Sequence, residues 1–288
     1  MLGEKTAPIG NRTVSKIPTK LVLICAGLVA GIAVGQSVNP RGDAGQSDDP
    51  NGLLLRPIPE KLVVLTFDDA CRSHAMFVGP LLQANGFGGT FYITEFAETF
   101  TNKTQYMTWE QIKSLDDLGM EVGNHTLLHW GPKSPGEFTR QTTVIEEHCV
   151  SSKIPKPTTF CWPFYDVEKD KLPILIQRGY LFARGGHNRP YQPTTDNPFD
   201  TPSFSISDSD AKRDKDVFYK AVKRATSGQI VILTFHGVPD LEHPTVGTDS
   251  ARFAEYVKYL KDNQYTVISM RDMAKYVATA KAAKLLVK

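Results

Sequence analysis

The sequence lacks most of the features that place a chain in a special class by composition alone. Its four cysteines, at positions 25, 71, 149 and 161, include no C-x-x-C pair, so they predict neither a zinc ribbon nor a disulfide framework, although one bridge among the last three stays open. The 33 basic and 31 acidic residues leave a net charge of only +2, which gives no reason to expect a nucleic-acid partner. No repeat or low-complexity tract interrupts the chain.

Long apolar runs are also scarce, and the one that stands out is residues 21–35, which follow a basic region over residues 1–20. The run is shorter than the ~20 residues of a typical membrane span, and it is apolar all round, unlike an amphipathic helix of a globular core. It therefore predicts a signal peptide or signal anchor. Because basic residues precede it, we expect the rest of the chain to be exported, to the periplasm or beyond the cell, and to stay at the membrane if the segment is not cleaved.

Residues 36–60 are rich in Gly, Pro, Asp and Ser and predict a flexible linker. From residue 61 to residue 288, short apolar runs alternate with helix-like segments, which is typical of α/β proteins with a parallel sheet. The predicted strands are 62–67, 89–93, 120–123, 158–162, 180–183, 203–206, 229–235 and 265–268. The predicted helices lie near 74–84, 109–118, 137–149, 167–178, 214–226, 250–262 and 270–285.

Seven or eight such units in one run predict a (β/α) barrel, closed or nearly so. An open doubly wound sheet is the alternative, but no Gly-rich phosphate loop follows any predicted strand. Helix boundaries are marked by Thr108 with Gln111 and by Ser269 with Asp272, two potential capping boxes, and by glycines at C-cap positions.

The first predicted strand ends in two adjacent carboxylates, Asp68 and Asp69, which is costly unless a cation or hydrogen bonds stabilise them. The strand 120–123 leads into His125 and His129, which are four residues apart and can converge on one ion. In a barrel, the C-terminal ends of the strands meet at one mouth. One Asp with two His is a ligand set that leaves a catalytic zinc an open position for water. The alternative is that the two Asp only cap the following helix.

A histidine, His236, follows the buried strand 229–235. A histidine at this place either satisfies a core carbonyl or serves as an acid or base near neutral pH. Its position at the mouth favours the second interpretation.

Four stretches in this order resemble the polysaccharide deacetylases of carbohydrate esterase family 4, the NodB-homology domain. They are Thr66–Asp69 (TFDD), His125–His129 (HTLLH), Phe160–Phe164 (FCWPF) and Phe235–Gly237 (FHG), and the resemblance extends over most of the predicted barrel. It implies a distorted (β/α)7 barrel and a divalent metal, commonly Zn²⁺. It also implies a hydrolase that removes acetyl groups from N-acetylated sugars or acetylated polysaccharides.

The resemblance further implies a role for each matching residue. Asp69, His125 and His129 would be the metal ligands, Asp68 the catalytic base and His236 the catalytic acid. A backbone N–H near Phe164 would help to hold the developing oxyanion. Aromatic side chains near the mouth, among them Trp162 and Phe164, are candidates for binding the sugar.

The chain departs from the family pattern at three places. Cys161 stands where the third motif usually has an Arg that orients the base, no fourth motif is present beyond the acidic cluster 207–210, and Thr234 stands where an apolar residue is common. Arg184 ends the predicted strand 180–183 and is our candidate both for replacing the missing Arg and for contacting substrate. The long loop from residue 184 to residue 201 is a candidate specificity lid.

Two other functions stay open at this point. The missing Arg is compatible with a catalytically impaired barrel that binds glycan without turning it over. A hydrolase with Cys71 or Cys161 as nucleophile is the other alternative, although the acids beside Cys71 would raise the pKa of its thiol.

Overall fold

A computed structural model describes residues 49–130, 133–207 and 216–287 of the chain. The basic region, the apolar segment 21–35 and most of the predicted linker lie outside these ranges, as do Asp208 and Asp210 of the acidic cluster. Among the described residues, no helix combines the length and the apolar character that crossing a membrane requires.

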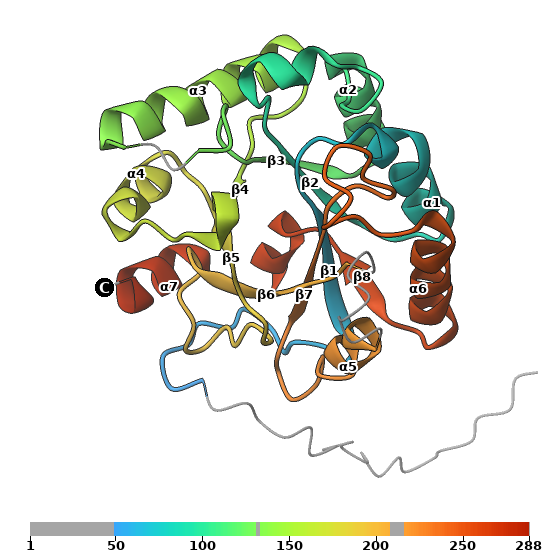
Figure 1. Cartoon of the computed structure of the whole chain (residues 1–288). Coiled ribbons are helices and arrows are strands. Elements are labelled where there is room, and N and C mark those ends of the chain that lie inside the picture. The colour runs from blue at the N-terminus through green and yellow to red at the C-terminus, as the bar shows by residue number, and fades with distance from the viewer. Residues whose placement is uncertain (1–48, 131–132, 208–215, 288) are drawn as a thin grey trace, which may run out of the picture. The chain divides into compact units, whose positions relative to one another are not determined.

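Seven parallel strands close into a ring, and an eighth strand adds to one edge of it (Figure 1). Each of β1 to β6 pairs with the next strand, and β7 pairs with β1 from Val63 opposite Val231 to Phe67 opposite Phe235. The strands are β1 Leu62–Phe67, β2 Thr90–Ile93, β3 Glu121–Asn124, β4 Thr159–Cys161, β5 Phe182–His187, β6 Thr201–Ser205, β7 Val231–Phe235 and β8 Thr266–Ile268. The predicted distorted (β/α)7 barrel is confirmed.

The distortion lies where the ring closes between β1 and β2. The first half of β1, Leu62–Val64, pairs with β8, whereas only its last residues pair with β2. Strand β8 therefore lies beside the N-terminal half of β1, where β2 does not pair with it. Gly88, just before β2, makes this possible, because a Cβ there would lie 2.9 Å from the backbone nitrogen of Ser269.

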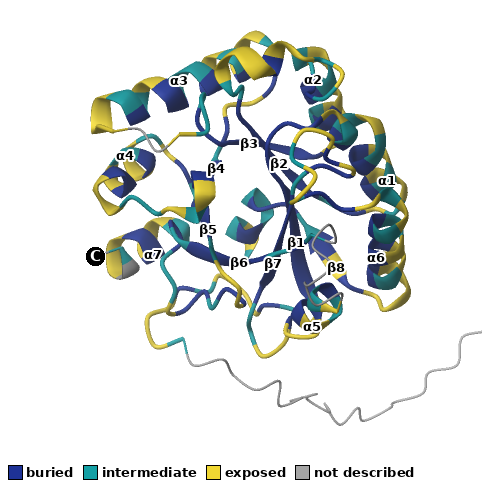
Figure 2. Cartoon of the chain, viewed as in Figure 1, coloured by how far each residue is buried: buried dark blue, intermediate teal, exposed yellow. Residues whose placement is uncertain are grey.

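Helices cover the outside of the ring, with their buried faces toward the strands and their exposed faces toward solvent (Figure 2). They are α1 Gly79–Ala84, α2 Trp109–Asp117, α3 Pro135–Ser151, α4 Leu172–Gln177, α5 Val217–Val222, α6 Ser250–Asp262 and α7 Thr279–Leu286. A π-helical turn, His74–Val78, precedes α1, and short 3-10 helices span Ala97–Thr101, Pro163–Tyr165, Lys169–Lys171 and Arg271–Lys275.

Alternation along β1 explains how the strand delivers its acids. Val63, Leu65 and Phe67 pack in the core layer beneath the helices, whereas Leu62 and Val64 belong to a second cluster inside the barrel. Because side chains alternate along a strand, the even-numbered positions continue inward. Asp68, the next even position after β1, therefore points into the mouth of the barrel.

The structure corrects three predictions about the elements. Residues 49–60 are not a linker, since Leu53 and Ile58 are buried in the inner cluster and Leu54 pairs with Val277. The predicted helix 270–285 is two helices separated by residues 276–278. Ser269 caps neither of them, and its hydroxyl has no hydrogen-bond partner. The capping box of Thr108 with Gln111 is confirmed.

Candidate active site

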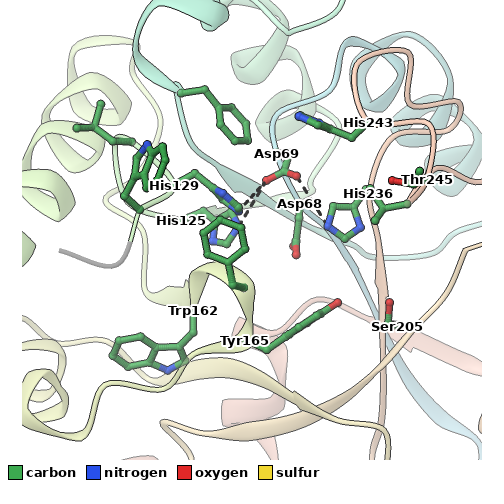
Figure 3. Close-up of a pocket in the computed structure, with 15 residues that line it drawn as sticks. Asp68, Asp69, His125, His129, Trp162, Tyr165, Ser205, His236, His243 and Thr245 are labelled. Carbon is green, nitrogen blue, oxygen red and sulfur yellow. Dashed lines mark ion pairs between the residues drawn. The ribbon is translucent and has the colours of Figure 1, made fainter. Parts of the chain in front are cut away.

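Side chains from the C-terminal ends of three strands meet at one mouth of the barrel (Figure 3). Asp68 and Asp69 follow β1, His125 and His129 follow β3, and His236 follows β7. The backbone of Asp69 has a φ of 75°, so the chain turns sharply there, and both neighbouring carboxylates reach the same space instead of opposite faces. Strained backbone of this kind occurs preferentially at functional sites.

Asp69, His125 and His129 form a compact group of three potential metal ligands. Their ligand atoms all lie within 4.8 Å of one another. Asp69 Oδ1 is 3.5 Å from His125 Nε2 and 3.4 Å from His129 Nε2. The structure thus brings together the three residues that the sequence predicted as ligands, in the number that a catalytic zinc site uses.

The surroundings of this group fit a cation. His125 Nδ1 lies 2.8 Å from the carbonyl oxygen of Cys161, and because a carbonyl only accepts, Nδ1 carries the proton and Nε2 presents its lone pair to the site. Burial lowers the pKa of His125 to about 4 and that of His129 to about 2, so both rings are neutral at pH 7. In the part of the chain that the structure describes, nothing forms a hydrogen bond with the buried Asp69 Oδ1. Burial together with Asp68 raises the pKa of Asp69. A bound cation would satisfy this oxygen.

Asp68 is held from behind by Arg184. The guanidinium Nη2 of Arg184 donates to Asp68 Oδ2, whereas Asp68 Oδ1 is buried and has no hydrogen-bond partner among the described residues. Burial alone would raise the pKa of Asp68, but the charge of Arg184 shifts the pKa below its ordinary value. Asp68 is therefore ionised at neutral pH, with one oxygen anchored and the other able to accept a proton.

Arg184 lies within β5, directly opposite Cys161 in the register of β4 and β5. Its Nη2 also donates to the Cys161 sulfur, and its Nη1 donates to the hydroxyls of Thr234 and Ser203. The guanidinium thus already occupies the space between Asp68 and Cys161. Asp68, Cys161 and His125 form a second possible ligand group. It is a poorer cation site, because the positive guanidinium of Arg184 contacts both Asp68 and Cys161.

The predicted place of Arg184 among the substrate-binding residues needs correction. Its side chain is fully buried and does not line the pocket. Nη1 and Nη2 donate to Asp68, Cys161 and the hydroxyls of Ser203 and Thr234, and Nε is buried without a partner among the described residues. β5 also continues to His187, so Arg184 belongs to the barrel wall and not to the loop that follows. Any effect of Arg184 on chemistry would act through Asp68.

His236 faces the carboxylates from the side opposite to His125 and His129 (Figure 3). Its Nε2 lies 3.8 Å from Asp69 Oδ2. Burial lowers the pKa of His236, and the charge of Asp68 offsets part of that decrease. The two carboxylates thus stand between the predicted ligands and the predicted acid.

The site opens into a pocket of about 560 Å³. Its apolar lining consists of Phe96, Leu128, Trp130, Trp162, Phe164 and Val246. The two aromatics that we predicted to bind substrate differ in exposure. Phe164 is 68% exposed and presents its ring 4.6 Å from that of His129, whereas Trp162 is 1% exposed and its indole N–H donates to the Phe199 carbonyl. Phe164 therefore offers a stacking face, and Trp162 mainly shapes the wall.

The predicted resemblance to polysaccharide deacetylases is confirmed. Residues 56–183 match the model of the polysaccharide deacetylase family, and this range includes Asp68, Asp69, His125 and His129. No curated protein matches the chain.

Solved structures of the polysaccharide deacetylase fold resemble the barrel at low sequence identity. A putative polysaccharide deacetylase from Mycobacterium smegmatis has a TM-score of 0.54 at 14% identity, over 76% of this chain and 92% of that one. The family 4 domain of a multidomain xylanase from the hindgut metagenome of Trinervitermes trinervoides has a TM-score of 0.52 at 18% identity, over 75% and 90%. A family 4 pseudoenzyme from Bacillus anthracis has a TM-score of 0.50 at 17% identity, over 75% and 66%. At these identities the likeness establishes the fold alone.

The three cysteines in the described part of the chain, Cys71, Cys149 and Cys161, are all free thiols. Burial and the nearby acid Asp240 raise the pKa of Cys71. Burial also raises the pKa of Cys161, despite the opposing effect of Arg184. Both thiols are protonated at neutral pH, which argues against the cysteine-nucleophile hydrolase.

The segment from residue 184 to residue 201 does not form the predicted lid. It contributes no residue to the pocket, and Tyr191 is instead fully buried beside Ile230, the residue that precedes β7. The pocket wall comes partly from the segment after β7, where His243 and Thr245 line it. Sequence reasoning missed these two residues. The signal that could have found them is their place in the loop that follows a strand end carrying His236.

Proposed function

We propose that the protein is a metal-dependent hydrolase that releases acetate from N-acetylated or O-acetylated sugars of a polysaccharide or cell-wall glycan. The observation that supports this best is the pair of buried carboxylates at the mouth. Asp69 Oδ1 faces two neutral histidines, and Asp68 Oδ1 has no hydrogen-bond partner, so one acid suits a cation and the other suits a proton. A helix cap would use both acids on backbone N–H groups instead.

Asp69, His125 and His129 would hold the cation, for which Zn²⁺ suits two imidazoles and a carboxylate. A bound divalent ion supplies a water of lowered pKa and polarises a carbonyl oxygen. Asp68 Oδ1 accepts the proton of the attacking water, and the nearby His236 donates a proton to the departing sugar nitrogen or oxygen. General base catalysis of this kind contributes about 10²- to 10⁴-fold to the rate.

Arg184 takes the orienting role of the Arg that is missing at position 161. Since residues 161 and 184 are register partners on neighbouring strands, a guanidinium from β5 reaches the same depth in the barrel as one from β4 would. The small Cys161 side chain leaves it room, and the Thr234 hydroxyl accepts one of its N–H groups. Cys161 and Thr234, which differ from the family pattern, thus both accommodate Arg184, whose guanidinium contacts the proposed base Asp68.

The substrate enters through the aromatic side of the pocket. Phe164 and Trp130 are exposed by 68% and 69%, and exposed rings of this kind stack on the apolar faces of sugars.

We also propose that the barrel is exported or anchored with the active site outside the cytoplasm, because residues 21–35 predict a signal segment. Recovery of the full chain from the soluble cytoplasmic fraction alone would contradict this placement.

The second candidate is a barrel that binds glycan without hydrolysing it. A specific observation keeps it in view, since one structure of similar fold is a family 4 pseudoenzyme. The site argues for turnover, because a binding module has no need of an ionised Asp68 held by a buried guanidinium.

Acetate release separates these functions. Purified protein is incubated with acetylated chitooligosaccharides, acetylated xylan and peptidoglycan fragments, with and without a chelator, beside Asp68→Asn and a thiol-alkylated sample. We expect release by the native protein, its loss with chelator, recovery on adding Zn²⁺, and a decrease of about 10²- to 10⁴-fold in Asp68→Asn. Tight glycan binding without release would favour the binding module, and chelator-resistant release that alkylation blocks would favour a cysteine nucleophile.

A further inference from the structure

His74 is a fully buried histidine that belongs to none of the sequence motifs. Its ring packs against Phe67 and Phe91, with ring centroids 5.7 and 5.5 Å apart. His74 also begins the π-helical turn that precedes α1, and such turns are rare and occur frequently at functional sites. An apolar side chain would fill this space without burying polar atoms, so the imidazole calls for an explanation.

The polar contact of His74 leads directly to the candidate acid. Its Nε2 lies 3.0 Å from the carbonyl oxygen of His236, 162 residues away in the sequence. Because a carbonyl only accepts, Nε2 carries the proton, and Nδ1 is left buried with no partner in the described ranges. Burial lowers the pKa of His74 to about 4, so the ring is neutral at pH 7 and keeps one tautomer.

Further hydrogen bonds hold the backbone just after His236. The hydroxyl of Ser73 accepts the backbone N–H of Val238, at 2.8 Å. The carboxylate of Asp240 accepts the backbone N–H of Gly237, at 3.2 Å, and the Cys71 sulfur lies 3.4 Å from the same oxygen. The peptide group that follows His236 is therefore held at its oxygen by His74 and at its nitrogen by Asp240.

We propose that His74 is a positioning residue that aims the imidazole of His236 at the leaving group. This inference rests on the deacetylation proposed above. In that reaction the water oxygen joins the acetyl carbon, Asp68 takes the water proton, the bond from carbon to the sugar nitrogen breaks, and that nitrogen receives a proton from His236. The products are acetate and a free amine. A displacement of about 1 Å in such a group can lower the rate by about 10²-fold.

The test uses two substrates that differ in their need for the acid. An acetylated chitooligosaccharide has an amine leaving group, which must be protonated as it departs. 4-Nitrophenyl acetate releases a phenolate that leaves without a proton. A residue that aims His236 should affect the amide much more than the aryl ester, whereas a residue that only supports the fold should affect both equally.

Three variants are compared with the native protein. His74→Leu keeps the volume but removes the donor, and His74→Gln places an amide N–H near the position of Nε2. Val78→Ala is the matched control, because Val78 is buried in the same π-helical turn and contacts the core instead of His236. Zinc content and thermal unfolding are measured for each, so that kcat refers to folded, loaded protein.

We expect His74→Leu to lower kcat on the amide by about 10- to 100-fold with KM nearly unchanged, and to lower aryl ester hydrolysis by less than about threefold. His74→Gln should recover most of the amide rate, and Val78→Ala should leave the ratio of the two rates at the native value. Equal loss on both substrates in His74→Leu, or the same change of ratio in Val78→Ala, would overturn the inference. A native protein that releases acetate from neither substrate would instead refute the proposed function, and the inference would fall with it.

Discussion

The barrel buries carboxylates at both of its ends, and the two ends treat them differently. Glu121, the first residue of β3, lies at the end where the strands begin and is 1% exposed. Its two oxygens accept hydrogen bonds from the hydroxyls of Thr90 and Thr159, at 2.8 and 2.7 Å, and from the backbone N–H of Arg271. This carboxylate is satisfied entirely by its own protein.

At the other end, Asp68 and Asp69 are 3% and 4% exposed, yet the Oδ1 atom of each has no hydrogen-bond partner within residues 49–130, 133–207 and 216–287. A protein that needed these acids only for stability would satisfy them as it satisfies Glu121, because an unpaired buried polar atom costs about 1–3 kcal/mol. This difference between the two ends is the one expected from the proposed function, in which Glu121 is structural and Asp68 and Asp69 serve a proton and a cation. Three substitutions test that separation.

The largest effect is expected for Asp69→Asn, which removes the only anionic member of the ligand group. We expect zinc to fall from about one ion per chain to a small fraction of that, and acetate release to fall below about a thousandth of the native rate. The metal-free variant should unfold at the same temperature as the metal-free native protein or higher, because one of two adjacent buried acids is gone. Elemental analysis, acetate assays and calorimetry measure the three quantities.

Asp117→Asn, at an exposed acid of α2, is the control for the Asp69 variant. It should keep the native zinc content and rate. An Asp69 variant that still binds zinc at full stoichiometry would place the metal, and with it the catalytic centre, somewhere else.

A smaller loss is expected for Arg184→Met. Without the guanidinium, Asp68 loses the donor at Oδ2, and we expect kcat to fall about 10- to 100-fold, as for other partners behind a catalytic group, while zinc content stays native. Arg184→Lys keeps the charge but loses the forked geometry that reaches Asp68 and Thr234 together. Its kcat should therefore lie between those of the native protein and Arg184→Met. Steady-state kinetics and elemental analysis on the same samples check this.

The same experiment can contradict the proposed role of Arg184. A native kcat in the methionine variant would mean that Asp68 needs no partner to be oriented. Loss of zinc together with activity would mean that Arg184 supports the ligand group and not the base.

The sequence predicted much of this site because its signals are local. The run from Leu62 to Phe67 is apolar and ends in two acids, which marks both a buried strand and what it delivers. The spacing of His125 and His129 is short enough to suggest convergence on one ion. Arg184 could be proposed because a charged residue at a strand end has few places to point in a barrel.

Other features could not be predicted because they depend on contacts between distant segments. His74 follows the β1 motif by a few residues, but its role depends on a carbonyl that only folding brings within 3.0 Å. Glu121 looked like an ordinary strand residue, since hydroxyls from β2 and β4 and a backbone N–H after β8 become its partners only when the ring closes. Leu53 and Ile58 lie in a stretch whose composition resembles a linker, yet the inner core buries both.

The smallest effect on function is expected at the structural end, for Glu121→Gln. The amide leaves one of the three donors unsatisfied, so we expect a loss of about 1–3 kcal/mol in the free energy of unfolding, with native kcat and zinc content. Burial raises the pKa of Glu121, and the hydrogen bonds from Arg271 and the threonines offset only part of that increase. Because the pKa of Glu121 is higher in the folded than in the unfolded protein, the stability that Glu121 contributes is present below its unfolded pKa and is lost as the pH rises through its folded pKa. The native protein should therefore exceed the variant in stability by more at about pH 5 than at about pH 8. Denaturant unfolding across this range measures the difference, and a variant that loses activity while remaining folded would mean that the two ends of the barrel are not separate after all.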